Sequence, residues 1–93
     1  YSNGVPVDFK LHNNYPNPFN PSTKIRFDIT EKTNVKIVVY NSAGMEITVL
    51  VNSELSAGMY ETSFTALNLP SGVYFYKLIT DSFTDTKKMI LLK

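Results

Sequence analysis

Apolar and polar residues alternate along most of this chain with a period of two. Between positions 24 and 29, Ile25, Phe27 and Ile29 share one face, while Lys24, Arg26 and Asp28 share the other. Such alternation is typical of a half-buried antiparallel strand. Comparable patterns predict seven strands in all, at residues 9–12, 24–29, 35–40, 45–51, 60–65, 73–80 and 84–92. Seven short strands at nearly even spacing, without a helical pattern, predict an all-β antiparallel sandwich.

The segments between these strands carry turn residues. Gly44 closes the turn that starts at Asn41, where a glycine is free to take a positive φ. A loop is predicted over residues 52–58, after a strand in which Met45, Ile47, Val49 and Val51 share one face. Residues 55–60 and 69–74 both match L-x-x-G-x-Y, with Gly58 and Gly72 ahead of Tyr60 and Tyr74. One match of six residues predicts two similar turn-to-strand junctions rather than a repeat architecture.

Strict alternation fails in three of the predicted strands. Residues 73–78 and 89–92 are apolar on both faces, and Val38 and Tyr40 add a third case. A two-layer sandwich buries one face of each strand, so some of these side chains should lie outside. Either loops cover them, above all the proline segment described next, or they form an apolar patch for a partner. The covered arrangement is favoured, because apolar atoms are common on protein surfaces.

The segment before the second strand contains three prolines within six residues, Pro16, Pro18 and Pro21. Each proline removes a backbone donor and fixes φ, and it moves the preceding residue towards an extended conformation. A helix is excluded, and a regular central strand is nearly excluded. The sequence therefore predicts a stiff loop that holds Tyr15 and Phe19 and clamps one end of the sandwich.

Composition and chemistry argue against catalysis. A chain of 93 residues is one domain, and a formal net charge of +1 is no electrostatic signature for nucleic acid or an anionic membrane. No cysteine is present, His12 is the sole histidine, and Asp81 and Asp85 alone are too few ligands for a calcium motif. We therefore predict no enzyme activity, cofactor or metal. Six Tyr and six Phe keep a carbohydrate-binding module as an alternative, which needs two or three coplanar exposed rings.

Four blocks in collinear order resemble the type A C-terminal sorting domain of the type IX secretion system. They are residues 14–25 (NYPNPFNPSTKI), residues 39–46 (VYNSAGME), the pair 57–60 and 71–78, and residues 86–93 (TKKMILLK). Asn41 and Met45 depart from the family, which often has Asp and Arg there. A weaker resemblance is to the immunoglobulin-like domain of flagellar hook-capping proteins.

The resemblance implies an immunoglobulin-like fold and a non-catalytic sorting role. It implies a cargo domain linked to the N-terminus, with residues 1–8 as the linker remnant and residues 9–93 as the sorting domain. The cargo passes through the periplasm, and an outer-membrane translocon and a sortase-like peptidase then deliver it to the cell surface or release it.

Recognition in this family centres on the final strand, here Lys87, Lys88, Met89, Ile90, Leu91, Leu92 and Lys93. The structural motif consists of Tyr15, Pro16, Pro18, Phe19, Pro21, Gly44, Gly58, Gly72 and Tyr74. A homodimer through the terminal strand stays open, as do two other roles for the chain: an accessory module of a secreted glycoside hydrolase or similar enzyme, and a structural spacer.

Overall fold

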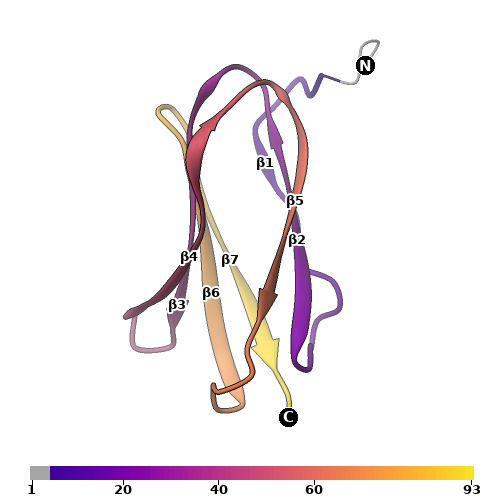
Figure 1. Cartoon of the computed structure of the whole chain (residues 1–93), viewed down its shortest axis with the longest axis vertical. Helices are drawn as coiled ribbons and strands as arrows, with labels where there is room; N and C mark the ends of the chain where they lie inside the picture. Colours follow the sequence, from indigo (N-terminus) through magenta and orange to yellow (C-terminus); the bar gives the residue numbers. More distant parts are fainter. Residues whose placement is uncertain (1–4) are drawn as a thin grey trace.

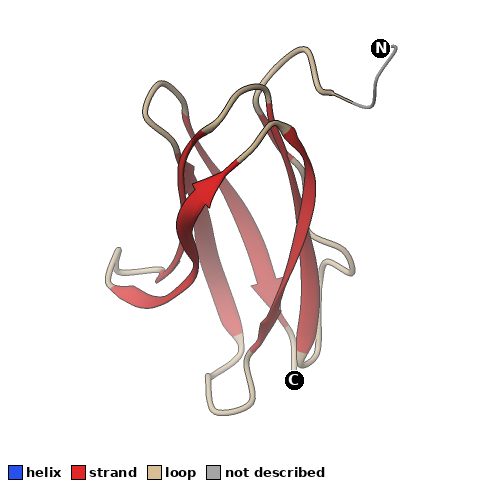
Figure 2. Cartoon of the chain, turned by 45° about the horizontal axis from the view of Figure 1, so that its top comes forward, coloured by secondary structure: helices blue, strands red, loops and turns tan. Residues whose placement is uncertain are grey.

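Two antiparallel sheets face each other in the computed structural model, which describes residues 5–93 (Figure 1). The strands are β1 (Lys10–Leu11), β2 (Ser22–Ile29), β3 (Thr33–Asn41), β4 (Glu46–Leu55), β5 (Gly58–Thr65), β6 (Gly72–Ile79) and β7 (Thr84–Leu91). One sheet has the order β1-β2-β5 and the other the order β4-β3-β6-β7. The described residues form no helix (Figure 2). The predicted all-β sandwich is confirmed; the immunoglobulin-like relationship stays a prediction.

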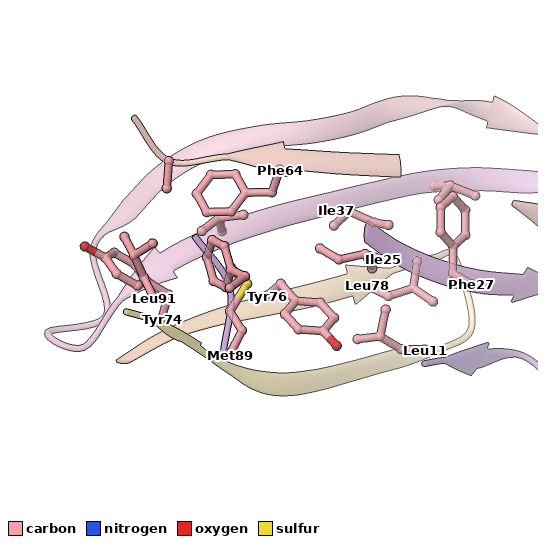
Figure 3. Packing of buried hydrophobic residues seen from close by; sticks show 14 of the residues in the cluster. Leu11, Ile25, Phe27, Ile37, Phe64, Tyr74, Tyr76, Leu78, Met89 and Leu91 are labelled. Atoms are coloured by element: carbon pink, nitrogen blue, oxygen red, sulfur yellow. The ribbon is translucent and has the colours of Figure 1, made fainter. Parts of the chain in front are cut away.

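The apolar faces of the two sheets meet in one core. In β2 the alternation holds throughout, so that Ile25, Phe27 and Ile29 are buried and Lys24 and Arg26 are exposed. Figure 3 shows Ile25 beside Leu78 of the other sheet, within the cluster of buried residues. Each fully buried side chain of this size contributes about 1.5–3 kcal/mol through the removal of apolar area from water.

The fourth strand differs from its prediction in length and in facing. It extends to Leu55, so most of the loop predicted over residues 52–58 is strand. Its pairing with β3 shifts register twice, between Ile37 and Val38 and between Val39 and Tyr40. Each shift inserts an extra residue, which reverses the side-chain alternation beyond it. The predicted common face of Met45, Ile47, Val49 and Val51 is therefore wrong: Ile47, Leu50 and Val51 pack against the core, whereas Met45 and Val49 are exposed.

The two L-x-x-G-x-Y segments use the same local device. The Tyr60 hydroxyl donates to the Ser56 carbonyl at 2.7 Å, and the Tyr74 hydroxyl donates to the Pro70 carbonyl at 2.7 Å. In each case a tyrosine near the start of a strand closes the turn four residues earlier. This supports the interpretation as two similar junctions. Nothing in the L-x-x-G-x-Y pattern alone indicates these hydroxyl bonds.

Candidate recognition site at the terminal strand

The predicted recognition residues do not lie on one face. Strand β7 pairs with β6 alone among the named strands and is the last strand of its sheet. Met89 and Leu91 point into the core and are fully buried, while Ile90 is half-buried on the outer face. Lys88 is exposed beside it, and Leu92 is 60% exposed just beyond the strand. Met89 and Leu91 therefore act first as core residues.

The free edge of β7 is already paired in part by the proline segment. Phe19 forms a parallel bridge with Leu91: its N–H donates to the Ile90 carbonyl at 2.9 Å, and its carbonyl accepts from the Leu92 N–H at 3.0 Å. The Ile90 N–H donates to Asn17 Oδ1 at 3.0 Å. An incoming strand at positions 90–92 would have to displace these bonds, because each residue has only one backbone donor and one backbone acceptor.

The remainder of this edge is short. In an antiparallel pair, alternate residues direct their N–H and C=O groups away from the partner strand. The backbone N–H and C=O of Ile90 point away from β6, so those of Lys88 and Thr86 do so as well. The Thr86 N–H donates to Asp85 Oδ1 at 2.9 Å. This leaves Lys88 as the centre of the edge that a β-strand partner would reach.

The last residue ties the chain end to the loop between β5 and β6. The Lys93 N–H donates to Ser71 Oγ at 2.9 Å, and Lys93 Nζ donates to the Leu67 carbonyl at 2.7 Å. In Figure 1 the C-terminus lies at the same end of the sandwich as the proline segment and this loop. The chain end is thus part of the folded domain rather than an extension from it.

The proline segment crosses from one sheet to the other. Tyr15 pairs with Lys24 of β2 at 3.0 and 2.9 Å, and its peptide bond to Pro16 is cis. Asn14 Nδ2 donates to Thr23 Oγ1 at 3.0 Å, and Thr23 Oγ1 donates to the Pro16 carbonyl at 2.9 Å. These bonds hold the start of the segment on β2, while its end lies on β7.

The two aromatic side chains of the segment point in opposite directions. The Phe19 ring is 2% exposed and meets Phe64 edge-on, with the centroids 5.9 Å apart and the planes at 62°. The Tyr15 ring is 80% exposed. The expectation that both rings clamp the sandwich is therefore wrong for Tyr15, which contributes only its backbone.

Tyr76 anchors the segment from inside the core. Its hydroxyl donates to the His12 carbonyl at 2.6 Å and accepts a hydrogen bond from the backbone N–H of Asn14. Burial raises the pKa of Tyr76 to about 12; the Asn14 N–H opposes this rise, and the Asp85 carboxylate adds to it. Sequence reasoning missed both Tyr76 and Asn17. In the sequence, Tyr76 is only a tyrosine within an apolar pattern and Asn17 only an asparagine before a proline. Neither feature indicates a partner far away in the chain.

The chemistry of the remaining candidates is modest. His12 Nε2 lies 3.1 Å from Asp28 Oδ1, on the neighbouring strand, rather than beside Asp8. Within residues 5–93, no group of three or more His, Asp or Glu side chains could hold a metal ion. Tyr15 is the one aromatic residue in that range whose side chain is largely exposed, and Tyr40 and Phe75, neighbours on the outer face of the four-stranded sheet, are half-buried; the described residues therefore present no set of largely exposed rings of the kind that a sugar platform needs. The same residues form no helix able to cross a membrane.

Comparison with known families gives one match. The family model described as "Secretion system C-terminal sorting domain" matches residues 13–92, from the start of the proline segment to the end of the terminal strand. No curated protein and no solved structure matches the chain. The matched range contains both the segment and the strand edge that it pairs.

Proposed function

The chain belongs to the family of C-terminal sorting domains of the type IX secretion system, and on this basis we propose that it directs a linked cargo across the outer membrane. The family is non-catalytic, and its members are signals for export to the outer membrane, the cell surface or the medium. In our proposal the cargo precedes this domain in a longer chain and passes through the periplasm. The translocon binds the folded domain, and a sortase-like peptidase cuts upstream of it, within or before residues 1–8. Residues 1–4 of that predicted linker lie outside the described residues.

The match across residues 13–92 is the observation that carries this proposal. A second observation supports it: the two ends of the matched range touch each other. Asn17 and Phe19 pair with Ile90 and Leu92, although more than 70 residues separate them in the chain. We propose that the translocon binds a composite surface, made of the exposed part of the terminal strand and the proline segment beside it.

Within that surface, the accessible side chains are the candidates for contact. Lys88 and Leu92 are exposed and Ile90 is half-buried, whereas Met89 and Leu91 are inaccessible in the folded domain. Pairing of two copies through β7 would be confined to the edge around Lys88, because the chain's own Phe19 occupies the rest. A homodimer through β7 is therefore less well supported than recognition of this strand by a different protein.

The test is surface display of a periplasm-targeted fluorescent protein fused ahead of the whole chain, in a host with a working type IX system. Protease-accessible fluorescence at the cell surface, lost when the translocon is disabled, is the expected result. Periplasmic retention of a fusion whose domain is folded would overturn the proposal. It would leave the accessory-module alternative, which predicts glycan binding by the isolated chain.

A point substitution tests the surface more sharply than truncation. Removing residues 91–93 would also remove the buried Leu91 side chain and the bonds of Lys93, so that loss of export could reflect unfolding. Leu92→Asp changes an exposed side chain instead, and Met45→Asp is its matched control, because Met45 is 64% exposed in a turn away from β7. We expect Leu92→Asp to reduce surface display and Met45→Asp to preserve it. Equal display of the two variants would remove Leu92 from the recognition surface.

A further inference from the structure

The outer faces of the two sheets differ in chemistry. The outer face of the three-stranded sheet is mainly polar, with Lys24 and Arg26 on β2 and Glu61 and Ser63 on β5; Met59 on β5 is an apolar exception and is 53% exposed. Lys24 and Glu61 form an ion pair at 3.7 Å. This is the normal composition of a solvated sheet face. The outer face of the four-stranded sheet differs from this composition, so the difference is a property of that one face.

An apolar stripe crosses the outer face of the four-stranded sheet. Register pairs Tyr40 with Phe75 and Val73 with Ile90, which places these side chains side by side on β3, β6 and β7. All four are half-buried, and Val38, next along β3, is 1% exposed although it lies outside the core cluster. We call these five residues the apolar stripe.

The hydrogen bonds of the proline segment reach this stripe only at its β7 end, at Ile90. The bonds of the proline segment run to β2, to Ala66 and to the edge of β7 at positions 90–92; among the described residues, none reaches β3 or the outer face of β6. The sequence-based expectation that this segment covers the apolar outer positions is supported at Ile90 and stays a prediction for the other positions. Val38 lies between Val49 and Lys77 in register, so neighbours on the same face are in position to bury it.

Three lysines border the stripe along one side. Lys36 pairs with Ile79, Lys77 with Val38 and Lys88 with Phe75, so the lysines step diagonally from β3 to β6 to β7. Diagonal neighbours on a sheet lie about 7–8 Å apart. Val38, Phe75 and Ile90 form the next diagonal, parallel to the first. We call Lys36, Lys77 and Lys88 the lysine diagonal.

The lysine diagonal has no internal counter-charge. Among the described residues, ion pairs join Lys24 with Glu61 and Lys32 with Glu54, and His12 Nε2 lies beside Asp28; none of these contacts includes a member of the diagonal. Two carboxylates of β4 lie on this face: Glu46, which pairs with Tyr40 on the far side of the stripe from the lysines, and Glu54, which pairs with Asn34 next to Lys36 and is itself within 3.7 Å of Lys32. Parallel rows of unpaired cations and apolar side chains call for a partner with carboxylates beside apolar groups.

We propose that the outer face of the four-stranded sheet is a docking surface for another protein that presents an acidic, apolar β-strand pair. Residues i and i+2 of a strand lie about 6.6–7 Å apart, close to the spacing of the lysine diagonal. A strand with Glu or Asp at alternate positions would face the lysines, and its neighbour, about 4.8 Å away, would place apolar side chains on the stripe. This inference concerns the face of the sheet, and it does not depend on the export role.

Two other occupants fit less well. A second copy would have to supply carboxylates at alternate positions of one strand, and none of the described strands has Asp or Glu at both i and i+2. An anionic membrane would attract the lysines, but surface binding grows with the apolar area that can be inserted. Here Val38 is buried and the rest of the stripe is half-buried, so the flat face offers little to insert.

The test uses the 93-residue chain, labelled with 15N, and a disulfide-closed hairpin peptide as the probe. The hairpin carries Glu at alternate positions of one strand and Val or Tyr at the matching positions of the other, on one face. We expect amide shift changes at the outer-face positions of β3, β6 and β7, and weakening of binding by added salt. A hairpin with Lys in place of Glu should not bind.

Variants of the chain identify the lysines responsible. Lys36→Glu, Lys77→Glu and Lys88→Glu together should weaken hairpin binding about tenfold or more, as expected for the loss of three exposed ion pairs and the introduction of repulsion. The control is Lys10→Glu, Lys24→Glu and Lys32→Glu, which changes the net charge equally but leaves the diagonal intact. The 15N spectrum of each variant establishes that it is folded.

Four outcomes would overturn the proposal. Equal weakening by the two triple variants would reduce the effect to net charge, and shift changes elsewhere would place binding on another surface. Binding to phosphatidylcholine vesicles that contain phosphatidylglycerol, without binding to the hairpin, would identify a membrane-contact face. Sedimentation of the free chain as a dimer that the diagonal variant disrupts would identify a second copy as the occupant. Since none of these measurements involves secretion, failure here leaves the sorting role untouched.

Discussion

Phe19→Ala tests whether the proline segment is part of the core. The ring is 2% exposed, meets Phe64 edge-on at 5.9 Å, and sits at the point where the segment pairs with β7. Truncating a buried phenylalanine to alanine costs about 3–5 kcal/mol, because transfer free energy is lost and a cavity remains. We expect a loss in that range, with the edge contact to Phe64 favouring the upper half.

That loss would be a large share of the total stability. A domain of this length has an unfolding free energy of about 5–14 kcal/mol, at about 0.05–0.15 kcal/mol per residue. The midpoint of thermal unfolding should therefore fall by more than about 10 °C, since 1 kcal/mol corresponds to about 4–8 °C for small domains. Urea denaturation followed by circular dichroism measures the change directly, because a lower midpoint at constant slope reports stability alone.

Tyr15→Ala is the matched control, because it removes an aromatic ring from the same segment at a position that is 80% exposed. Substitutions at exposed positions usually change stability by about 0.5 kcal/mol or less. If Phe19→Ala and Tyr15→Ala had the same small effect, Phe19 would not be a core residue. The segment would then be a free loop, and the assignment of its end to the edge of β7 would fail with it.

Three further substitutions probe bonds outside the regular strands. Tyr76→Phe should cost about 1–3 kcal/mol at pH 7, because the part-buried His12 carbonyl and the Asn14 N–H lose their partner. Since folding raises the pKa of Tyr76 to about 12 from 10.0, its contribution is complete below pH 10 and is lost as the pH rises towards 12. Urea titrations should therefore show the stability gap to Tyr76→Phe narrowing by about 2 kcal/mol by pH 11.5. A constant gap would contradict this. Gly44→Ala should cost about 1–2 kcal/mol in the same titration, because φ is +83° there and nothing lies near the added Cβ, and Gly44→Asn should cost less. Asn17→Ala should cost about 0.5–1.5 kcal/mol and speed hydrogen exchange at the Ile90 amide, while Asn20→Ala, which also precedes a proline, should leave that amide protected.

How far the sequence predicts this fold depends on whether a local pattern decides the outcome. Strand β2 follows its alternation from Thr23 to Ile29, because a period of two suffices to choose a face. The adjacent strand pair shows the limit. Two register shifts in the pairing of β4 with β3 change which β4 side chains point into the core. Nothing in the sequence of residues 45–51 indicates a bulge, because a bulge is a property of the pair of strands.

The proline segment shows a second limit. Its prolines correctly exclude regular structure, and by the same effect they remove the periodicity that assigns side chains to a face. Tyr15 and Phe19 are similar in sequence context, yet one ring is in solvent and the other in the core. The bonds that decide this, from Asn17 to Ile90 and from Tyr76 to His12, join positions 73 and 64 residues apart. Only the assembled sandwich brings them together.

These contacts restrict how the terminal strand can be recognised. Met89 and Leu91 are buried, and the edge at positions 90–92 is held by Asn17 and Phe19, so a partner that binds the folded domain has access to Lys88, Ile90 and the chain end. A partner that reads Met89 or Leu91 would first have to separate β7 from the core, at the expense of much of the domain's stability. The two modes respond differently to stability. Lys88→Glu should impair recognition of a folded domain without lowering its unfolding free energy. Phe19→Ala lowers the stability of the domain, so it should hinder recognition of the folded domain and assist recognition of a released β7. Export of a Phe19→Ala fusion at or above the level of the unchanged chain would therefore favour recognition of a released strand, whereas reduced export would favour recognition of the intact sandwich.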